Sequence, residues 1–120
     1  MMKLLSLALS GFLLLAAGLP AAAHSALDSA EPAEGAVLDA TPDAISLGFT
    51  EALELALSEI TLTDATGAVI QTGAPEAEGG DARLLRVTLP DLSPGVYKVD
   101  WKVTSVDTHS TSGSYSFTVK

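Results

Sequence analysis

The sequence predicts an all-β domain, an immunoglobulin-like Greek-key β-sandwich or barrel of about seven strands, preceded by a cleavable signal peptide. Two observations favour this fold class. After the first 23 residues, apolar and polar residues alternate with period two through most of the chain, which is the pattern of strands that bury one face. Clusters of Gly, Pro, Asp and Thr interrupt this alternation at short intervals and indicate tight turns.

Residues 1–23 have the layout of a secretory signal peptide, with one cation, an apolar run over 4–17 and small residues at the end. The apolar run is shorter than the roughly 20 residues that cross a bilayer. Cleavage after Ala23 satisfies the small-x-small rule. We therefore expect an exported mature domain of residues 24–120 that starts at His24 and has no membrane anchor.

The first predicted strand, 44–50, has the sequence AISLGFT, in which apolar residues at every second position share one face. The second, 57–64, alternates in the same way. A short third strand, 67–72, follows the DATG turn at 64–67. Between the first two, 51–57 (EALELAL) is interpreted as a loop that enters a strand rather than as a helical turn.

Three further strands complete the pattern and are predicted over 84–90, 96–106 and 113–119. The remaining turn signals stand at 31–35, 41–43, 76–80 and 92–95. Four aromatic residues lie on the last two strands: Trp101 is predicted to pack in the core, and Tyr97, Tyr115 and Phe117 are predicted to be core or sheet-face residues. No repeat or linker divides the mature chain, so one domain is expected.

The composition excludes several classes of function. The chain has 15 acidic and 6 basic residues, a formal net charge of −9, so it offers no basic patch for nucleic acid. It has no cysteine, which excludes disulfides, a lipid-anchored cysteine and thiolate metal sites. The acidic surface is typical of a solubility device, although it also attracts cations.

The only two histidines, His24 and His109, stand where they could share a metal ion. Asp107 and His109 are two residues apart, so on a strand they would point to the same face with Cα atoms about 6.6 Å apart. Signal cleavage would make His24 the N-terminus, whose α-amine and imidazole form a chelate. Three nitrogens and one carboxylate oxygen suit Cu(II) in a tetragonal geometry, ahead of Ni(II) and Zn(II).

Each of these signals alone has a plainer alternative. D-x-H is a short motif, and a histidine at a strand end is often a surface residue. A histidine behind a signal peptide can arise by chance. The joint occurrence, in a chain with no other histidine and no cysteine, favours the metal site. Ser105, Thr108 and Ser110 are then candidates to hold the ring nitrogens in place.

The mature chain resembles the CopC family of periplasmic copper-resistance proteins over essentially its whole length. Four features carry the resemblance: the N-terminal His24, the P-x-x-G turn at 32–35, the F-T-E at 49–51, and the segment WKVTSVDTHSTSGSYSF at 101–117. These pieces include the residues that form the candidate metal site. The resemblance implies a small immunoglobulin-like β-barrel located in the periplasm.

The resemblance also implies one Cu(II) per chain, bound by the amine and imidazole of His24 with Asp107 and His109 completing the site. Some members have a nearby glutamate as a weak axial or outer ligand. Glu51 occupies that position and, by strand parity, ends an inward-facing row, although a surface acid at a strand end fits its place equally well. Other members carry a methionine-rich Cu(I) site. Here the only two methionines open the signal peptide, so a Cu(II)-only member is expected.

The leading hypothesis is a copper carrier that buffers Cu(II) for resistance or uptake. The resemblance implies an inner-membrane CopD-type copper transporter as its partner. We expect a monomer with no enzymatic activity. Two alternatives belong to other classes. One is a copper redox enzyme with a histidine brace, which is disfavoured because a carboxylate ligand stabilises Cu(II) against reduction. The other is an immunoglobulin-like structural module that binds no metal.

Overall fold

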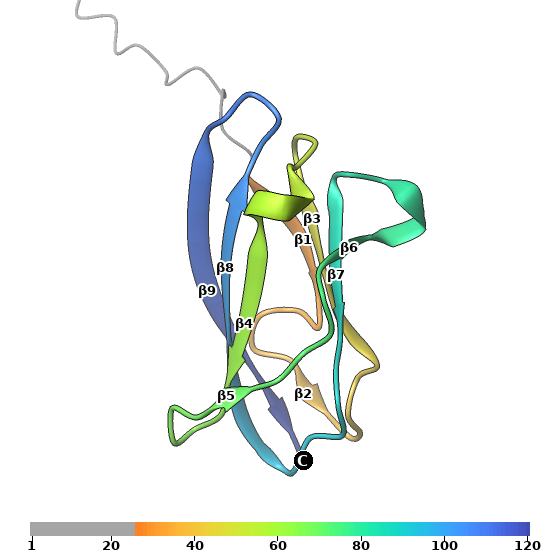
Figure 1. Cartoon of the computed structure of the whole chain (residues 1–120). Coiled ribbons are helices and arrows are strands. Elements are labelled where there is room, and N and C mark those ends of the chain that lie inside the picture. The colour runs from red at the N-terminus through yellow and green to blue at the C-terminus, as the bar shows by residue number, and fades with distance from the viewer. Residues whose placement is uncertain (1–25) are drawn as a thin grey trace, which may run out of the picture.

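Two β-sheets packed face to face form the domain in the computed structural model, which describes residues 26–120 (Figure 1). Within those residues, the first sheet has four strands in the order β1 (Leu27–Glu31), β3 (Ala44–Phe49), β7 (Leu84–Thr88) and β6 (Glu76–Ala77). The second has five, in the order β2 (Val37–Leu38), β9 (Ser110–Val119), β8 (Gly95–Thr104), β4 (Glu59–Thr63) and β5 (Val69–Ile70). Neighbouring strands are antiparallel except β2 and β9, which are parallel. The predicted all-β fold class is confirmed.

Three strands lie outside the predicted set: β1, β2 and β6. β1 has the sequence LDSAE and alternates poorly, while β2 and β6 have two residues each, too few for a period to be visible. β6 and a short 3-10 turn, η2 (Glu78–Gly80), occupy the stretch predicted as one turn. Within residues 26–120, no helix has the length and apolar character needed to cross a membrane.

The prediction of a plain loop over 51–57 is wrong at its end, where Leu55–Leu57 form one turn of 3-10 helix, η1. The N–H of Ser58 closes this turn by donating to the oxygen of Leu55 at 3.1 Å. The hydroxyl of Ser58 also donates to the oxygen of Glu54 at 2.8 Å. Local hydrogen bonds at the entrance of β4 therefore stabilise a helical turn in the segment predicted as a loop.

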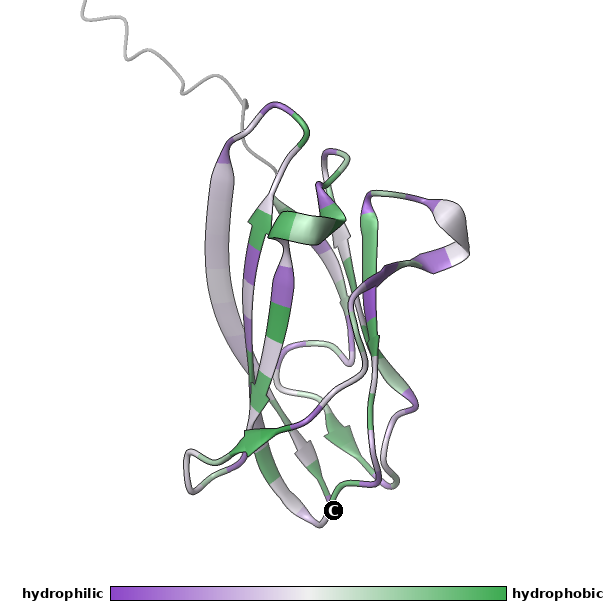
Figure 2. Cartoon of the chain, viewed as in Figure 1, coloured by the Kyte–Doolittle hydropathy of each residue, from purple (hydrophilic) through white to green (hydrophobic). Residues whose placement is uncertain are grey.

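The inward-facing residues of both sheets form one apolar core. Figure 2 shows the underlying alternation along β4, where hydrophobic and hydrophilic residues follow one another. The predicted inward residues of β3 and β4 are buried, namely Ile45, Leu47, Phe49, Ile60 and Leu62. Three of the four aromatic predictions are also buried: Tyr97, Tyr115 and Phe117. The period-two pattern therefore identifies the core correctly.

β8 and β9 form a long hairpin inside the five-stranded sheet, paired over ten residue positions. The two strands are joined by residues 105–109, called the hairpin loop below. This loop lies at the same end of the sandwich as the start of β1 (Figure 1). The topology thus brings the beginning of the described chain and the hairpin loop to one end of the molecule.

Trp101, the only tryptophan, is partly buried and packs against the core as predicted. Its ring meets Phe49 edge-on, with centroids 5.3 Å apart. Its partner across the ladder is Gly113, and a Cβ atom at Gly113 would lie 2.5 Å from Cζ2 of Trp101. The indole therefore lies across a position that has room only for glycine.

Replacing Gly113 by Ala should lower the free energy of unfolding by about 1–3 kcal/mol, because the added methyl group overpacks against the indole. Urea unfolding followed by Trp101 fluorescence measures the change, and the native emission of the variant should also shift. Ser114→Ala, at the exposed neighbouring position, is the matched control and should stay within about 0.5 kcal/mol of the original. Equal stability of Gly113→Ala and the original chain would show that the ring leaves space there.

Candidate metal centre

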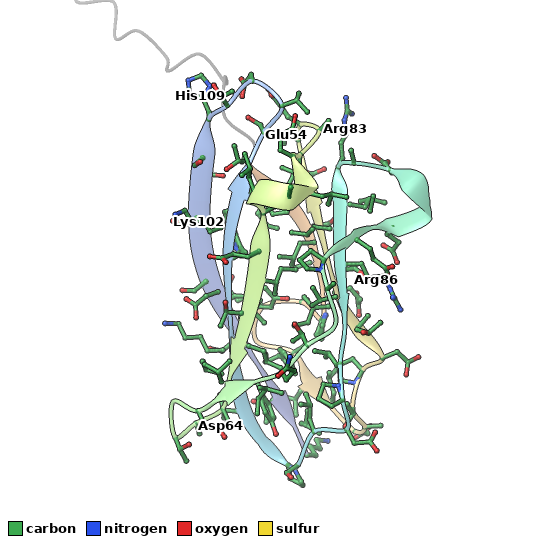
Figure 3. All side chains as sticks on the ribbon, in the orientation of Figure 1. Glu54, Asp64, Arg83, Arg86, Lys102 and His109 are labelled. Carbon is green, nitrogen blue, oxygen red and sulfur yellow. The ribbon has the colours of Figure 1, made fainter. Side chains whose placement is uncertain are left out.

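Asp107 and His109 lie in the hairpin loop, so the prediction that they share one face of a strand is wrong. β8 ends at Thr104, and its inward-facing row continues only to Ser105, which is fully buried. The strand stops because the chain must reverse there for β9 to pair with β8. Figure 3 shows His109 at the outer end of this hairpin.

The hairpin loop closes on itself and thereby brings Asp107 and His109 together. The N–H of Ser105 donates to the oxygen of His109, and the N–H of Thr108 donates to the oxygen of Ser105, both at 2.9 Å. Thr108 has a φ of 73°, in the left-handed region that β-branched residues rarely adopt. A sharp turn between the two residues, rather than a strand, places their side chains next to each other.

The two oxygens of the Asp107 carboxylate have different partners. Oδ1 accepts hydrogen bonds from the Ser105 hydroxyl and from the N–H of His109, the latter at 3.3 Å. Oδ2 lies 3.3 Å from Nδ1 of His109. The hydrogen bond from Ser105, followed by those from His109, holds the pKa of Asp107 below its usual value. A charged oxygen therefore stands beside an imidazole nitrogen at neutral pH.

This pair of atoms fits a shared metal ion. Two donor atoms about 2.0 Å from an ion and at right angles to each other are about 2.8 Å apart, which is close to the 3.3 Å between Oδ2 and Nδ1. The side chains of Asp107 and His109 are 39% and 49% exposed. A small movement would bring both atoms onto one ion, and the ion can reach them from solvent.

The structure does not bring Glu51 into a ligand set with this pair. Glu51 follows β3 and is partly buried, and the inward-facing row of β3 stops at Phe49. Within residues 26–120, no three His, Cys, Asp or Glu side chains gather into a group that could hold a metal ion. The remaining predicted ligand, His24, lies outside the described residues, as does the predicted signal peptide.

Ala26, the first described residue, is hydrogen-bonded to Thr50, within residues 50–52. This stretch also holds the hairpin loop and is called the anchoring segment below. Ala26 and Thr50 exchange two hydrogen bonds of 3.0 Å, one between their main chains and one to the Thr50 hydroxyl. Two residues further on, the oxygen of Ala52 accepts from the N–H of Val106 in the hairpin loop at 3.0 Å. No sequence signal indicates this role for Thr50, because it depends on a contact between distant segments.

Three hydroxyl residues were candidates to hold the ring nitrogens, and their described contacts lie elsewhere. The Ser105 hydroxyl donates to the carboxylate of Asp107. The Thr108 hydroxyl donates to the main-chain oxygen of Asp107 at 2.5 Å. The hydroxyls of Ser110 and Thr104 lie 2.9 Å apart at the end of the ladder. Of the three, Ser105 is the one whose hydroxyl contacts the carboxylate of a candidate ligand residue.

Comparisons with known proteins agree with one another. The family model described as the CopC domain matches residues 27–120. Protein YobA of Escherichia coli strain K12 is 41% identical over 99 residues, which cover 82% of this chain and 80% of that protein. Copper resistance protein C of Xanthomonas campestris pv. juglandis is 41% identical over 105 residues, covering 82% and 81%. The crystal structure of PcoC, a methionine-rich copper resistance protein from E. coli, matches with a TM-score of 0.72 and 32% identity, over 82% of this chain and 100% of that chain.

In the metal-free protein, the Asp107 carboxyl should titrate below its ordinary value of 3.8, as measured by 13C NMR. Because the folded-state pKa is the lower one, the charged carboxylate contributes stability above about pH 4, and this contribution is lost as the pH falls through the folded-state pKa. Ser105→Ala should raise the pKa of Asp107. Asp64, whose pKa is lowered mainly by the Thr66 hydroxyl, is the internal control and should not move. A normal pKa for Asp107 would contradict the described hydrogen bonds.

Proposed function

Because the chain belongs to the CopC family, we propose that it is a copper-binding protein that carries Cu(II) in the periplasm. In this proposal the processed chain, residues 24–120, holds one Cu(II) through the α-amine and imidazole of His24, the imidazole of His109 and a carboxylate oxygen of Asp107. The observation that supports it best is the Asp107–His109 pair in a solvent-accessible loop, with Oδ2 and Nδ1 3.3 Å apart.

The chemistry of this donor set supports Cu(II) over other cations. Three neutral nitrogens and one anionic oxygen match the tetragonal preference of Cu(II), which also binds such ligands more tightly than Ni(II) or Zn(II). An α-amine is a metal ligand only when no residue precedes it, so removal of the signal peptide would create one of the four donors and complete its chelate with the imidazole of the same residue. The carboxylate of Asp107 would offset part of the charge of the ion and stabilise its oxidised form.

The connectivity supports a contribution from His24. Two residues of extended chain span at most about 7 Å, and His24 precedes Ala26 by two residues. Ala26 is hydrogen-bonded to Thr50, and the neighbouring Ala52 is hydrogen-bonded to the hairpin loop. A short tether of this kind keeps the entropic cost of closing the site small.

We assign Glu51 to an outer or weak axial contact, because it adjoins Thr50 in the anchoring segment but forms no three-residue ligand group with Asp107 and His109. A separate Cu(I) site is not part of the proposal. PcoC is methionine-rich, whereas both methionines of this chain lie in its first two positions, so the mature domain lacks the thioether ligands that Cu(I) prefers.

The proposed role is transport rather than catalysis. The half-exposed ligand pair leaves an ion accessible to a partner protein, and relatives of the chain are named copper resistance proteins. We propose that the domain acts as a monomer and exchanges copper with an inner-membrane CopD-type transporter, in either resistance or uptake.

The processed chain should bind one Cu(II) tightly in a competitive titration, with a nitrogen-rich tetragonal electron paramagnetic resonance spectrum. The same chain with one alanine retained before His24 should bind orders of magnitude more weakly, because its α-amine has become an amide. Mass spectrometry establishes the N-terminus of each sample. Equal, weak binding by both forms would remove His24 from the site and overturn the proposed function.

Two matched variants complete this experiment. Asp107→Asn replaces the proposed anionic oxygen ligand by a neutral amide and should weaken Cu(II) binding, whereas Asp64→Asn should leave it unchanged. Asp64 is a suitable control because it also accepts hydrogen bonds within a tight turn but lies at the opposite end of the molecule (Figure 3).

Deleting the gene should change growth of the host organism in excess copper or under copper limitation. Reintroducing a gene that encodes the Asp107→Asn variant should not correct the defect. Lower tolerance to excess copper would assign the protein to resistance, and poorer growth under limitation would assign it to uptake. Unchanged growth in both media would argue against the carrier role in the cell even if the purified protein binds Cu(II).

A further inference from the structure

Ser105 occupies a core position that usually holds an apolar side chain. It continues the inward-facing row of β8, where Val99 and Val103 are completely buried, and it is completely buried itself. A hydroxyl removed from water costs free energy unless it forms a hydrogen bond. The side chain of Ser105 satisfies this requirement with acceptors in the hairpin loop.

The Ser105 hydroxyl is directed at the Asp107 carboxylate. It donates to Oδ1 of Asp107, and a second acceptor, the oxygen of His109, lies 3.2 Å away. A hydroxyl has a single proton to donate. A charged carboxylate is a stronger acceptor than a neutral carbonyl, so the carboxylate is the dominant partner.

This hydrogen bond determines which carboxylate oxygen faces the imidazole. Oδ1 is held by the hydroxyl of Ser105 and the N–H of His109, and Oδ2 is left 3.3 Å from Nδ1 of His109. The last torsion of an aspartate side chain is broad and roughly two-fold. On a loop whose side chains are partly exposed, a carboxylate would otherwise sample orientations that turn it away from the imidazole.

We propose that Ser105 is a positioning residue for copper binding, whose hydroxyl fixes the Asp107 carboxylate so that Oδ2 stays beside His109 before the ion arrives. This inference rests on the proposed copper site. Ser105 belongs to the rigid core of the sandwich rather than to the exposed part of the loop. A group on a rigid element holds a ligand more accurately than a group on a loop. Loss of an outer group that orients a metal ligand typically lowers metal affinity by about 10- to 100-fold.

Ser105→Ala should therefore weaken Cu(II) binding by about 10- to 100-fold in a competitive titration of the processed chain. Its paramagnetic resonance spectrum should shift toward that of Asp107→Ala, because the oxygen ligand is no longer held. Ser105→Thr keeps the hydroxyl and should recover most of the affinity. Unchanged affinity and an unchanged spectrum in Ser105→Ala would overturn the inference.

Ser58→Ala is the matched control. Ser58 is a buried serine near the same end of β8, but its hydroxyl donates to the oxygen of Glu54 and accepts from the N–H of Thr104. Its loss should lower stability without weakening copper binding. If both serine variants weaken binding equally, the effect is general destabilisation and the positioning role fails.

A double-mutant cycle tests whether Ser105 acts through Asp107. In the Asp107→Ala background, Ser105→Ala should cause no further loss of Cu(II) affinity, because the group that it positions is absent. A full additional loss in that background would contradict the proposed route. The comparison also separates this inference from the proposed function: if the original processed chain itself fails to bind Cu(II), the proposed function fails, whereas normal binding by Ser105→Ala removes only the positioning role.

A measurement on the unaltered protein covers the case in which Ser105→Ala does not fold. NMR scalar couplings report the χ1 torsion of Asp107 in the metal-free state, and this torsion decides whether the carboxylate lies beside Ser105 and His109. A single rotamer supports a carboxylate fixed before copper arrives. Rotamer averaging would overturn the inference whatever the variants do.

Discussion

The ladder between β8 and β9 is the interaction on which the rest of the structure depends. It pairs ten positions of each strand, and its two strands lie inside the five-stranded sheet, with β4 on one side and β2 on the other. Its inward-facing residues supply a large part of the core, including Tyr97, Val99, Val103, Tyr115 and Phe117. The loop that closes this ladder carries both described candidate ligands, so the same backbone pairing builds the core and places the site.

A second constraint ties the end of this hairpin to the opposite sheet. The chain leaving β3 crosses over to β8, where Leu53 forms an isolated bridge with Ser105 and the N–H of Glu54 donates to the oxygen of Thr104 at 2.8 Å. Leu53 is buried, and its N–H also donates to the oxygen of Ala82, just before β7. The candidate site therefore lies where the two sheets are joined, and its geometry is fixed by both of them.

A copper carrier must hold its ion and also release it, and the two requirements act on different parts of this site. The proposed ligand pair is half-exposed, which would leave an ion within reach of a partner. The group proposed to orient the carboxylate, Ser105, is completely buried. Accuracy would thus come from the core and accessibility from the loop, so neither property needs to be sacrificed for the other.

The sequence by itself determined the class of the fold and the chemistry of the proposed ligands. Alternation identified Ile45, Leu47 and Phe49 as core because a period of two depends only on which face of a strand is buried. Residue types, their spacing and the predicted cleavage before His24 together indicated nitrogen and carboxylate donors at His24, Asp107 and His109. The tertiary structure decided the relative placement of these residues. A local sequence pattern does not determine that placement, because it depends on where the chain reverses and on contacts between distant segments. The tertiary structure placed Asp107 and His109 on a turn rather than a strand, left Glu51 outside their group, and joined Ala26 to Thr50 in the anchoring segment that holds the hairpin loop.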